Sequence, residues 1–236
     1  MANFYKKSQF AGGGAQPEKA QSGRSMIEML GVLAIIGVLS LVSISAYSKA
    51  MAKYQLNQHA EALSSLLNSV ISLLPDFQRQ YGKASEAISL APIFNATSML
   101  PAGMNYNPMR NSVEDIFKNT MRITYTLDPG GTTEYYMSFN LGSDGDRIAA
   151  RNRGVCLNIM MIAQQNAANI YAIDMRSYKE EGGSVSGARL TGGTYRSGNK
   201  SKRLATATLN DLSDACDSCN STKNCNITLY IDVRRY

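Results

Sequence analysis

The chain has 236 residues, of which 44% are hydrophobic, and it carries a formal net charge of +6. A positive charge of this size permits contact with anionic surfaces but gives no argument for a nucleic-acid partner. The sequence has no patch of aromatic and basic residues that would stack bases, and no glycine motif that would cradle phosphates. It also has no recognisable set of nucleophile and base or of metal ligands, so we expect no enzymatic activity and no cofactor.

The first predicted element is a membrane-spanning helix. The twenty residues from Met29 to Ser48 include no charge, and at about 1.5 Å per residue they reach roughly 30 Å, the thickness of a bilayer's hydrocarbon layer. A secretory signal peptide is the alternative, because small residues also occur at 43–46. The preceding segment has an excess of positive charge, with Lys6, Lys7, Lys19 and Arg24 against Glu18. This bias predicts that the N-terminus stays in the cytoplasm and that the rest of the chain crosses the membrane.

An acidic residue, Glu28, lies at the edge of this apolar segment. A carboxylate in hydrocarbon costs roughly 2.5 to 3.5 kcal/mol, so an acid at this depth is expected to have a function and a partner. We expect the partner to be a neighbouring copy of the same protein.

The hexapeptide Gly23-Arg24-Ser25-Met26-Ile27-Glu28 and the uncharged run after it resemble the N-terminus of type IV pilins and their relatives. The resemblance extends to about Ala50 and implies a leader, residues 1–23, that ends in glycine. A prepilin peptidase would cut between Gly23 and Arg24, the new N-terminus at Arg24 would be methylated, and Glu28 would be the fifth mature residue. Two features depart from the family: Arg24 replaces the usual apolar first residue, and the helix lacks the proline that many pilins carry.

Small residues recur at every third position of the apolar helix, at Gly31, Ala34, Gly37, Ser40, Ser43 and Ala46. Such residues allow close approach between helices, although they are also common in membrane helices generally. We expect the Glu28 carboxylate to be neutralised by the N-terminal amine of an adjacent subunit, which would fix the axial stagger between copies. Pairing with Arg24 in the same helix is the alternative.

The helix is predicted to continue beyond the membrane and to end at Pro75. Residues 24–74 would thus form one helix, embedded in the membrane first and packed on a globular head second. His59, the only histidine, is expected to be exposed to solvent. The apolar stripe of the second half recurs at spacings of four and three residues, at Leu56, Ala60, Leu63, Leu67, Val70 and Leu74.

Residues 75–236 are enough for one head domain of ordinary size. Residues 76–111 are interpreted as a connecting region, followed by a short helix that begins near Asn111 and runs to Phe117. Alternating apolar and polar residues predict strands over 121–127 and 135–141, joined by a type II turn at Pro129-Gly130.

The remaining head segments complete an α+β pattern. We expect a buried helix at 154–168, a strand at 170–175, a long glycine-rich and serine-rich surface loop at 176–204, and a last strand at 227–233. A sheet of three to five antiparallel strands, covered on one face by the second half of the long helix, would bury all these stripes. The resemblance to pilins implies the same architecture.

All four cysteines, Cys156, Cys216, Cys219 and Cys225, follow the apolar helix, on the side where disulfides are expected. Three pairings are possible, and we favour Cys156 with Cys216 or Cys219, which would tie the C-terminal region to the buried helix. A zinc site at Cys216-x-x-Cys219 is the alternative. Asp144-Gly145-Asp146 is interpreted as an ordinary turn and not as a calcium site, because the loop lacks the ligands of an EF-hand.

The resemblance implies a structural subunit that waits in the inner membrane, with its head on the periplasmic side, and polymerises into a helical surface filament. Its partners would be other copies of itself, the prepilin peptidase and an inner-membrane assembly platform. Such a pilus would serve adhesion, motility, DNA uptake or conjugation. A pseudopilin of a type II secretion system is one alternative, and a signal-anchored periplasmic enzyme or receptor is another.

Overall fold

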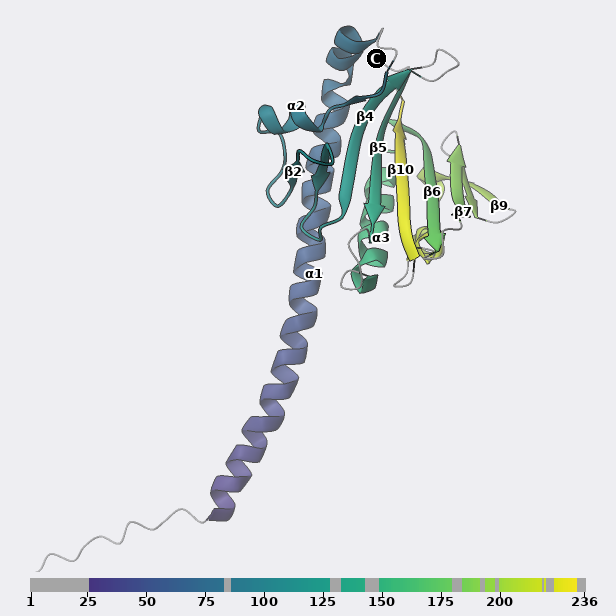
Figure 1. Cartoon of the computed structure of the whole chain (residues 1–236). Coiled ribbons are helices and arrows are strands. Elements are labelled where there is room, and N and C mark those ends of the chain that lie inside the picture. The colour runs from purple at the N-terminus through teal and green to yellow at the C-terminus, as the bar shows by residue number, and fades with distance from the viewer. Residues whose placement is uncertain are drawn as a thin grey trace, which may run out of the picture. The chain divides into compact units, whose positions relative to one another are not determined.

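The computed structural model describes residues 26–82, 86–127, 133–142, 149–179, 184–191, 194–197, 200–217, 219 and 223–232. The chain divides into two compact units, Met1–Lys49 and Ala50–Tyr236. The first unit contains the N-terminal part of helix α1 (Met26–Tyr81). The second unit, called the head below, contains the rest of α1 and every other element (Figure 1).

Helix α1 extends seven residues beyond the predicted end, because Pro75 lies inside the helix and does not terminate it. The prediction that the helix ends at Pro75 is wrong for a packing reason. The apolar stripe continues through Leu74 and Phe77, which are both buried. The Phe77 ring packs against the rings of Tyr81, Phe94 and Tyr135, so the last turns of α1 bury apolar surface that offsets the loss of one helical hydrogen bond at proline.

Over the described residues, the head is built on a ten-stranded antiparallel sheet in the order β2-β3-β4-β5-β10-β6-β7-β8-β9, with β1 paired to β4. The strands are β1 (Ile88–Ser89), β2 (Asn105–Asn107), β3 (Ser112–Glu114), β4 (Thr120–Leu127), β5 (Thr133–Leu141), β6 (Ile170–Lys179), β7 (Ser184–Thr191), β8 (Thr194–Ser197), β9 (Lys200–Arg203) and β10 (Lys223–Ile231). The helices are α2 (Ala91–Ala96), α3 (Ala149–Gln165), the 3-10 turn η1 (Leu204–Thr206) and α4 (Leu209–Cys216).

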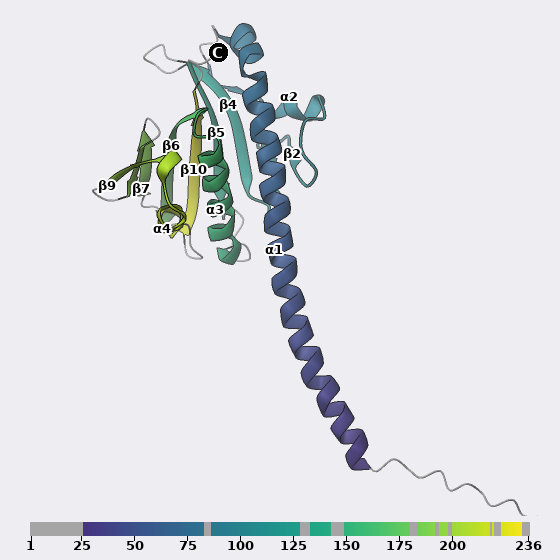
Figure 2. The same ribbon diagram turned by 180° about the vertical axis from the view of Figure 1, so that it is seen from behind.

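The core lies between one face of the sheet and the helices. Figures 1 and 2 place α3 and the head portion of α1 on the same face, and Figure 2 shows α4 there as well. Cross-strand neighbours form continuous rows on this face, and the central row is buried throughout: Ile123 of β4, Met137 of β5, Leu229 of β10 and Ile173 of β6. The predicted α+β fold, a long helix packed on an antiparallel sheet, is confirmed.

Several local predictions are also confirmed. Strands β4 and β5 pair as the predicted hairpin, α3 is the predicted buried helix, and β6 and β10 fall on the two other predicted strands. The proposed turn at Pro129-Gly130 and the loop at Asp144-Gly145-Asp146 lie outside the described residues.

Other predictions are wrong because they underestimate the extent of the β-sheet. The sheet has more strands than the three to five expected, because the described residues of 176–203 form the end of β6 and strands β7, β8 and β9 instead of a surface loop. Residues 112–114 form strand β3 and do not begin a helix. Asn111 adopts a positive φ of 49°, which a turn between β2 and β3 requires and a helix N-terminus does not.

Candidate functional site

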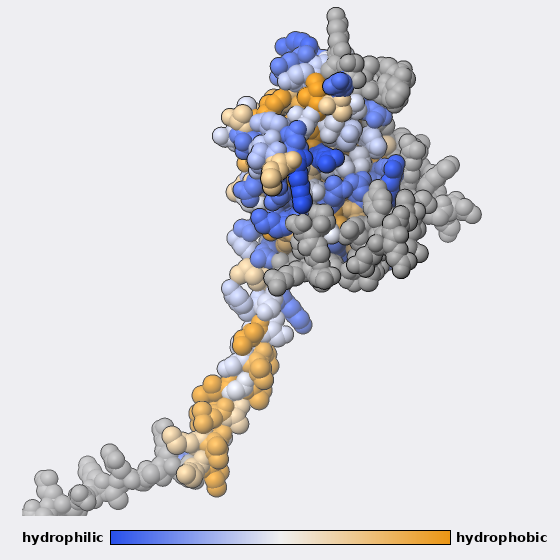
Figure 3. Space-filling view, in the orientation of Figure 1, coloured by the Kyte–Doolittle hydropathy of each residue, from blue (hydrophilic) through white to orange (hydrophobic). Residues whose placement is uncertain are grey.

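The N-terminal part of α1 presents an exposed apolar surface. Its large apolar side chains, from Met26 to Tyr47, are between 54% and 83% exposed. Figure 3 shows them as an almost continuous hydrophobic surface. This is the one helix within the described ranges that is long and apolar enough to cross a membrane. An apolar surface of this size is stable only when lipid or other protein covers it.

Two serine hydroxyls of this segment are satisfied inside the helix itself. The Ser40 hydroxyl donates to the carbonyl of Ile36 and the Ser43 hydroxyl donates to that of Leu39, both at 2.7 Å. Because the backbone of a helix is also internally bonded, these two serines and the helix backbone need no hydrogen bonds from water, as a hydrocarbon environment demands.

Two glycines of the segment, Gly31 and Gly37, are not required by contacts within the chain. A Cβ atom at either position would meet nothing within 4 Å. What the missing side chains provide is a place where the backbone of another helix can approach closely.

Glu28 lies in the first turn of α1, and its side chain is exposed. A carboxylate at this end of a helix is favoured by the helix dipole, so the acid and the helix start support each other. Gly23 and Arg24 lie outside the described residues, and the predicted cleavage between them, the methylation of Arg24 and its pairing with Glu28 therefore stay predictions.

The four cysteines form two buried disulfides. Cys156 of α3 bonds to Cys216 of α4, one of the two pairings favoured from the sequence, and Cys219 bonds to Cys225 of β10. The zinc alternative at Cys216 and Cys219 is wrong, because both sulfurs are held in disulfides.

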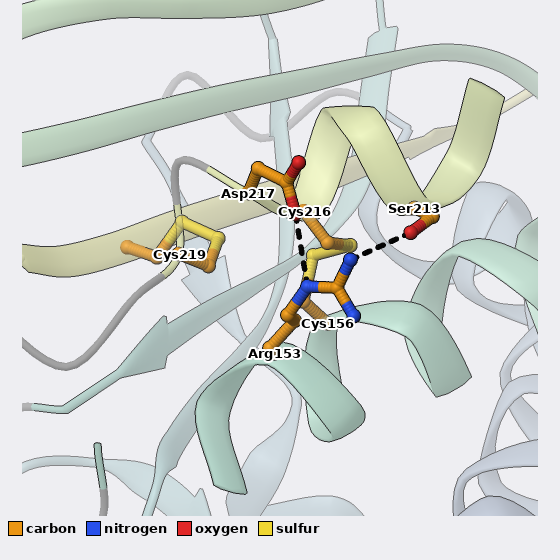
Figure 4. Close-up of a disulfide and its surroundings, with 7 residues drawn as sticks. Arg153, Cys156, Ser213, Cys216, Asp217 and Cys219 are labelled. Atoms are coloured by element: carbon orange, nitrogen blue, oxygen red, sulfur yellow. Dashed lines mark hydrogen bonds and ion pairs between the residues drawn. A yellow bond between two sulfur atoms is a disulfide. The ribbon is translucent and has the colours of Figure 1, made fainter. Parts of the chain in front are cut away.

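Polar contacts surround the Cys156–Cys216 bond (Figure 4). Arg153, one turn before Cys156, donates from Nε to the Asp217 carboxylate at 2.9 Å and from a terminal nitrogen to the Ser213 hydroxyl at 2.7 Å. Helix α4 begins with a capping box in which Thr208 and Asp211 exchange hydrogen bonds. Together the disulfide and these contacts join α4 to α3.

His59 is buried, and the expectation of an exposed histidine is wrong. Its side chain is 2% exposed, and Nε2 lies 3.1 Å from Oδ2 of Asp115, in the turn between β3 and β4. Asp115 also accepts hydrogen bonds from the backbone N–H groups of Phe117 and Asn119 and from the Asn119 side chain. The burial could have been read from the stripe, since His59 lies three residues after Leu56 and four before Leu63.

The His59–Asp115 pair joins α1 to the sheet and is buried. The Asp115 side chain is only 8% exposed, and the Phe117 ring packs on the imidazole at a centroid distance of 5.5 Å. Within the part of the chain that the structure describes, no group of three or more histidine, cysteine or acidic residues could hold a metal ion.

Comparison of the chain with protein-family models, with curated proteins and with solved structures gives no match.

Proposed function

We propose that this chain is a structural subunit of a type IV pilus, held in the inner membrane by the first part of α1 and then polymerised into a helical surface filament. The main observation that supports the proposal is that the apolar side chains of α1 are exposed to solvent in its first part and buried in its second part. Up to Tyr47 its large apolar side chains are open, whereas Leu63, Leu66, Leu67 and Leu74 of the same helix are at most 1% exposed in the head.

The open part of the helix suits two environments in succession. Lipid tails and the side chains of neighbouring helices are similarly apolar, so moving the helix from the membrane into a bundle of identical helices changes its hydrophobic free energy little. The exposed positions of Gly31 and Gly37 then favour the bundle, where backbones can approach.

Glu28 favours movement of the helix from the membrane into the filament, and it fixes the axial position of one subunit relative to the next. In hydrocarbon its carboxylate is unfavourable by roughly 2.5 to 3.5 kcal/mol, and an amine from a neighbouring subunit removes that penalty only at one axial offset. Cleavage after Gly23 by a prepilin peptidase creates this amine at Arg24, so processing precedes assembly. An inner-membrane assembly platform extracts the subunits, and the disulfide-bonded head ends on the extracellular surface of the filament.

The test is to shear surface material from the native cells and to determine the N-terminal sequence and mass of the protein in it. We expect fibres whose subunits begin at Arg24, with a mass that fits one added methyl group and two disulfides. Protein that begins at Met1, with no fibre recovered, would overturn the proposal.

Replacing Glu28 separates assembly from anchoring. Glu28→Ala subunits should be cleaved and inserted normally but should be depleted from fibres, because the neighbour's amine has no carboxylate to meet. Asp76→Ala is the matched control, since it removes an exposed acid from the same helix within the head. Fibre yields that are equal for both variants would contradict the role given to Glu28.

A further inference from the structure

We propose that heads of successive subunits associate by inserting Met109 of one copy into a hollow beside α1 of the next. The inference rests on the proposed function, because it names the contact that neighbouring heads make in the filament.

The inserting group is the turn between β2 and β3, residues 108–111. Met109 is 93% exposed, the largest value among the exposed apolar side chains of the described residues. The turn beneath it is held rigidly: Asn107 Oδ1 accepts the backbone N–H groups of Met109 and Arg110, at 3.1 and 3.2 Å. The backbone of this preformed turn loses little conformational freedom on binding. The methionine side chain loses rotamer freedom when it is buried, but its flexibility lets it adapt to irregular apolar surfaces.

Further hydrogen bonds fix the same turn to the head. Tyr106 donates from its hydroxyl to the Asn111 side chain at 3.1 Å, and Ser89 of β1 donates to the Asn111 carbonyl at 3.2 Å. The Asn107 side-chain amide donates to Glu114 across the hairpin. The position of Met109 is therefore set by the sheet and not by its own segment alone.

The receiving hollow has a volume of about 320 Å³ and lies between α1 and the segment that leads into β2. Its lining is apolar at Ala62, Pro101, Ala102 and Ile116, with Gly103 between them and Gln58 and Glu61 at its polar edge. Gly103 keeps this surface concave, because its φ is +85° and a Cβ there would lie 2.5 Å from Cγ2 of Ile116.

Charge complementarity favours a second copy of this chain as the occupant. Arg110 follows Met109 in the chain and is exposed, and the exposed Glu61 brings a carboxylate to the edge of the hollow. When the thioether enters the hollow, the two opposite charges meet beside it. Such a rim contact sets orientation and partner choice more than it adds affinity.

Topology prevents a subunit from filling its own hollow. Strands β2 and β3 pair Asn105 with Glu114 at one end and Asn107 with Ser112 at the other. Gly103 and Ile116 flank the first end, whereas Met109 lies beyond the second, so the hairpin separates them. Two different surfaces that meet in this way make a head-to-tail contact, and repetition of such a contact generates an open helical filament when it does not close into a ring.

Cysteine cross-linking in assembled fibres tests the contact. Met109→Cys combined with Ala102→Cys should give a ladder of covalent oligomers on a non-reducing gel after mild oxidation, because each copy carries both partners. Met109→Cys combined with Leu209→Cys is the control, since Leu209 is also exposed but lies on α4. Fibres that form normally but give no ladder with the 109 and 102 pair overturn this inference and leave the proposed function standing, whereas absence of fibres from the unmodified protein overturns the proposed function.

Charge reversal tests the rim separately. Arg110→Glu and Glu61→Arg should each reduce fibre yield by about tenfold, because each places like charges side by side. The double variant should return to within about twofold of the unmodified protein. A double variant no better than the single ones, with all three heads melting at the temperature of the unmodified protein, would contradict the pairing.

Discussion

At the level of single residues, Tyr135 is the clearest case of a polar group that the head tolerates without a partner. Its ring is fully buried against Phe77 and Tyr125, and its hydroxyl makes no hydrogen bond within the described part of the chain. Burial raises the pKa of the Tyr135 phenol above its ordinary value, because the charged phenolate loses its hydration. The fold therefore holds the neutral form.

We expect this residue to make the head less stable at high pH. In the unfolded chain tyrosine ionises near pH 10, so above about pH 10 the unfolded state releases a proton that the folded state keeps. The contribution is fully present below that pH and is lost at about 1.4 kcal/mol per pH unit above it. Denaturant unfolding of the full chain in detergent, followed by circular dichroism between pH 8 and pH 12, measures the slope.

The Tyr135→Phe variant should flatten this slope and should raise the free energy of unfolding at neutral pH by about 1 kcal/mol, since it deletes an unsatisfied buried hydroxyl. Tyr136→Phe is the matched control, because Tyr136 is only half-buried and contacts Tyr230. Slopes that are identical in the unmodified chain and in Tyr135→Phe would refute the assignment.

The environment of a residue could be predicted from the sequence only where the residues that it contacts lie close to it in the chain. The buried position of His59 was available from its spacing to Leu56 and Leu63, but its partner Asp115 is far away in the chain, so the pair itself was not. Glu28 could be singled out because it is an acidic residue directly beside a long apolar segment, and the role predicted for it stays a prediction. The exposed turn at Met109 and the hollow beside α1 exist only once the β2–β3 hairpin has folded, so no local sequence pattern predicts them.

At the level of elements, α1 carries a proline in a position where a helix normally ends. Pro75 has no N–H, so the carbonyl of Ile71 lacks its helical partner, and the ring crowds the preceding turn. Buried contacts of Leu74 and Phe77 hold the last turns in place despite this.

Replacing Pro75 by alanine should therefore stabilise the head, by up to about 3 kcal/mol, because it restores one helical hydrogen bond and removes the crowding. The denaturant midpoint of the full chain in detergent reports the change. Gln80→Ala, at an exposed position of the same helix, should change stability by only a few tenths of a kcal/mol. A loss of stability in Pro75→Ala would show that the proline is needed for the path of the helix.

Strands were predictable from sequence only where their two faces differ. β4, β5 and β10 alternate apolar and polar residues because one face packs on helices, and this period was readable. β7, β8 and β9 lie toward the edge of the sheet and are rich in serine and basic residues, so they lack such a pattern. They are strands because a neighbouring strand supplies their hydrogen bonds, and strand propensity depends strongly on that context.

At the level of the whole molecule, the strand order places the end of the chain at the centre of the sheet. β10 lies between β5 and β6, and α3 connects those two strands across it. Every strand with an alternating pattern is a candidate neighbour of every other, so the α+β class could be predicted from sequence but this order could not. The arrangement makes the C-terminal segment essential to the core, and the two disulfides fix the region that precedes β10.

The two disulfides should contribute unequally to the stability of the head. Cys156 and Cys216 are 60 residues apart in sequence, whereas Cys219 and Cys225 are 6 apart. By the entropy of loop closure in the unfolded chain, removing the first bond should cost about 4 kcal/mol and removing the second about 2 kcal/mol.

All four cysteines are buried, so paired replacement by alanine deletes the same atoms from similar surroundings in each case. The difference between the two losses of stability therefore reports the effect of loop length. Denaturant midpoints of the Cys156→Ala/Cys216→Ala and Cys219→Ala/Cys225→Ala variants, measured on the full chain in detergent, give the comparison. Equal losses, or a larger loss for the short loop, would show that native-state packing around the sulfurs, and not the unfolded chain, sets their contribution.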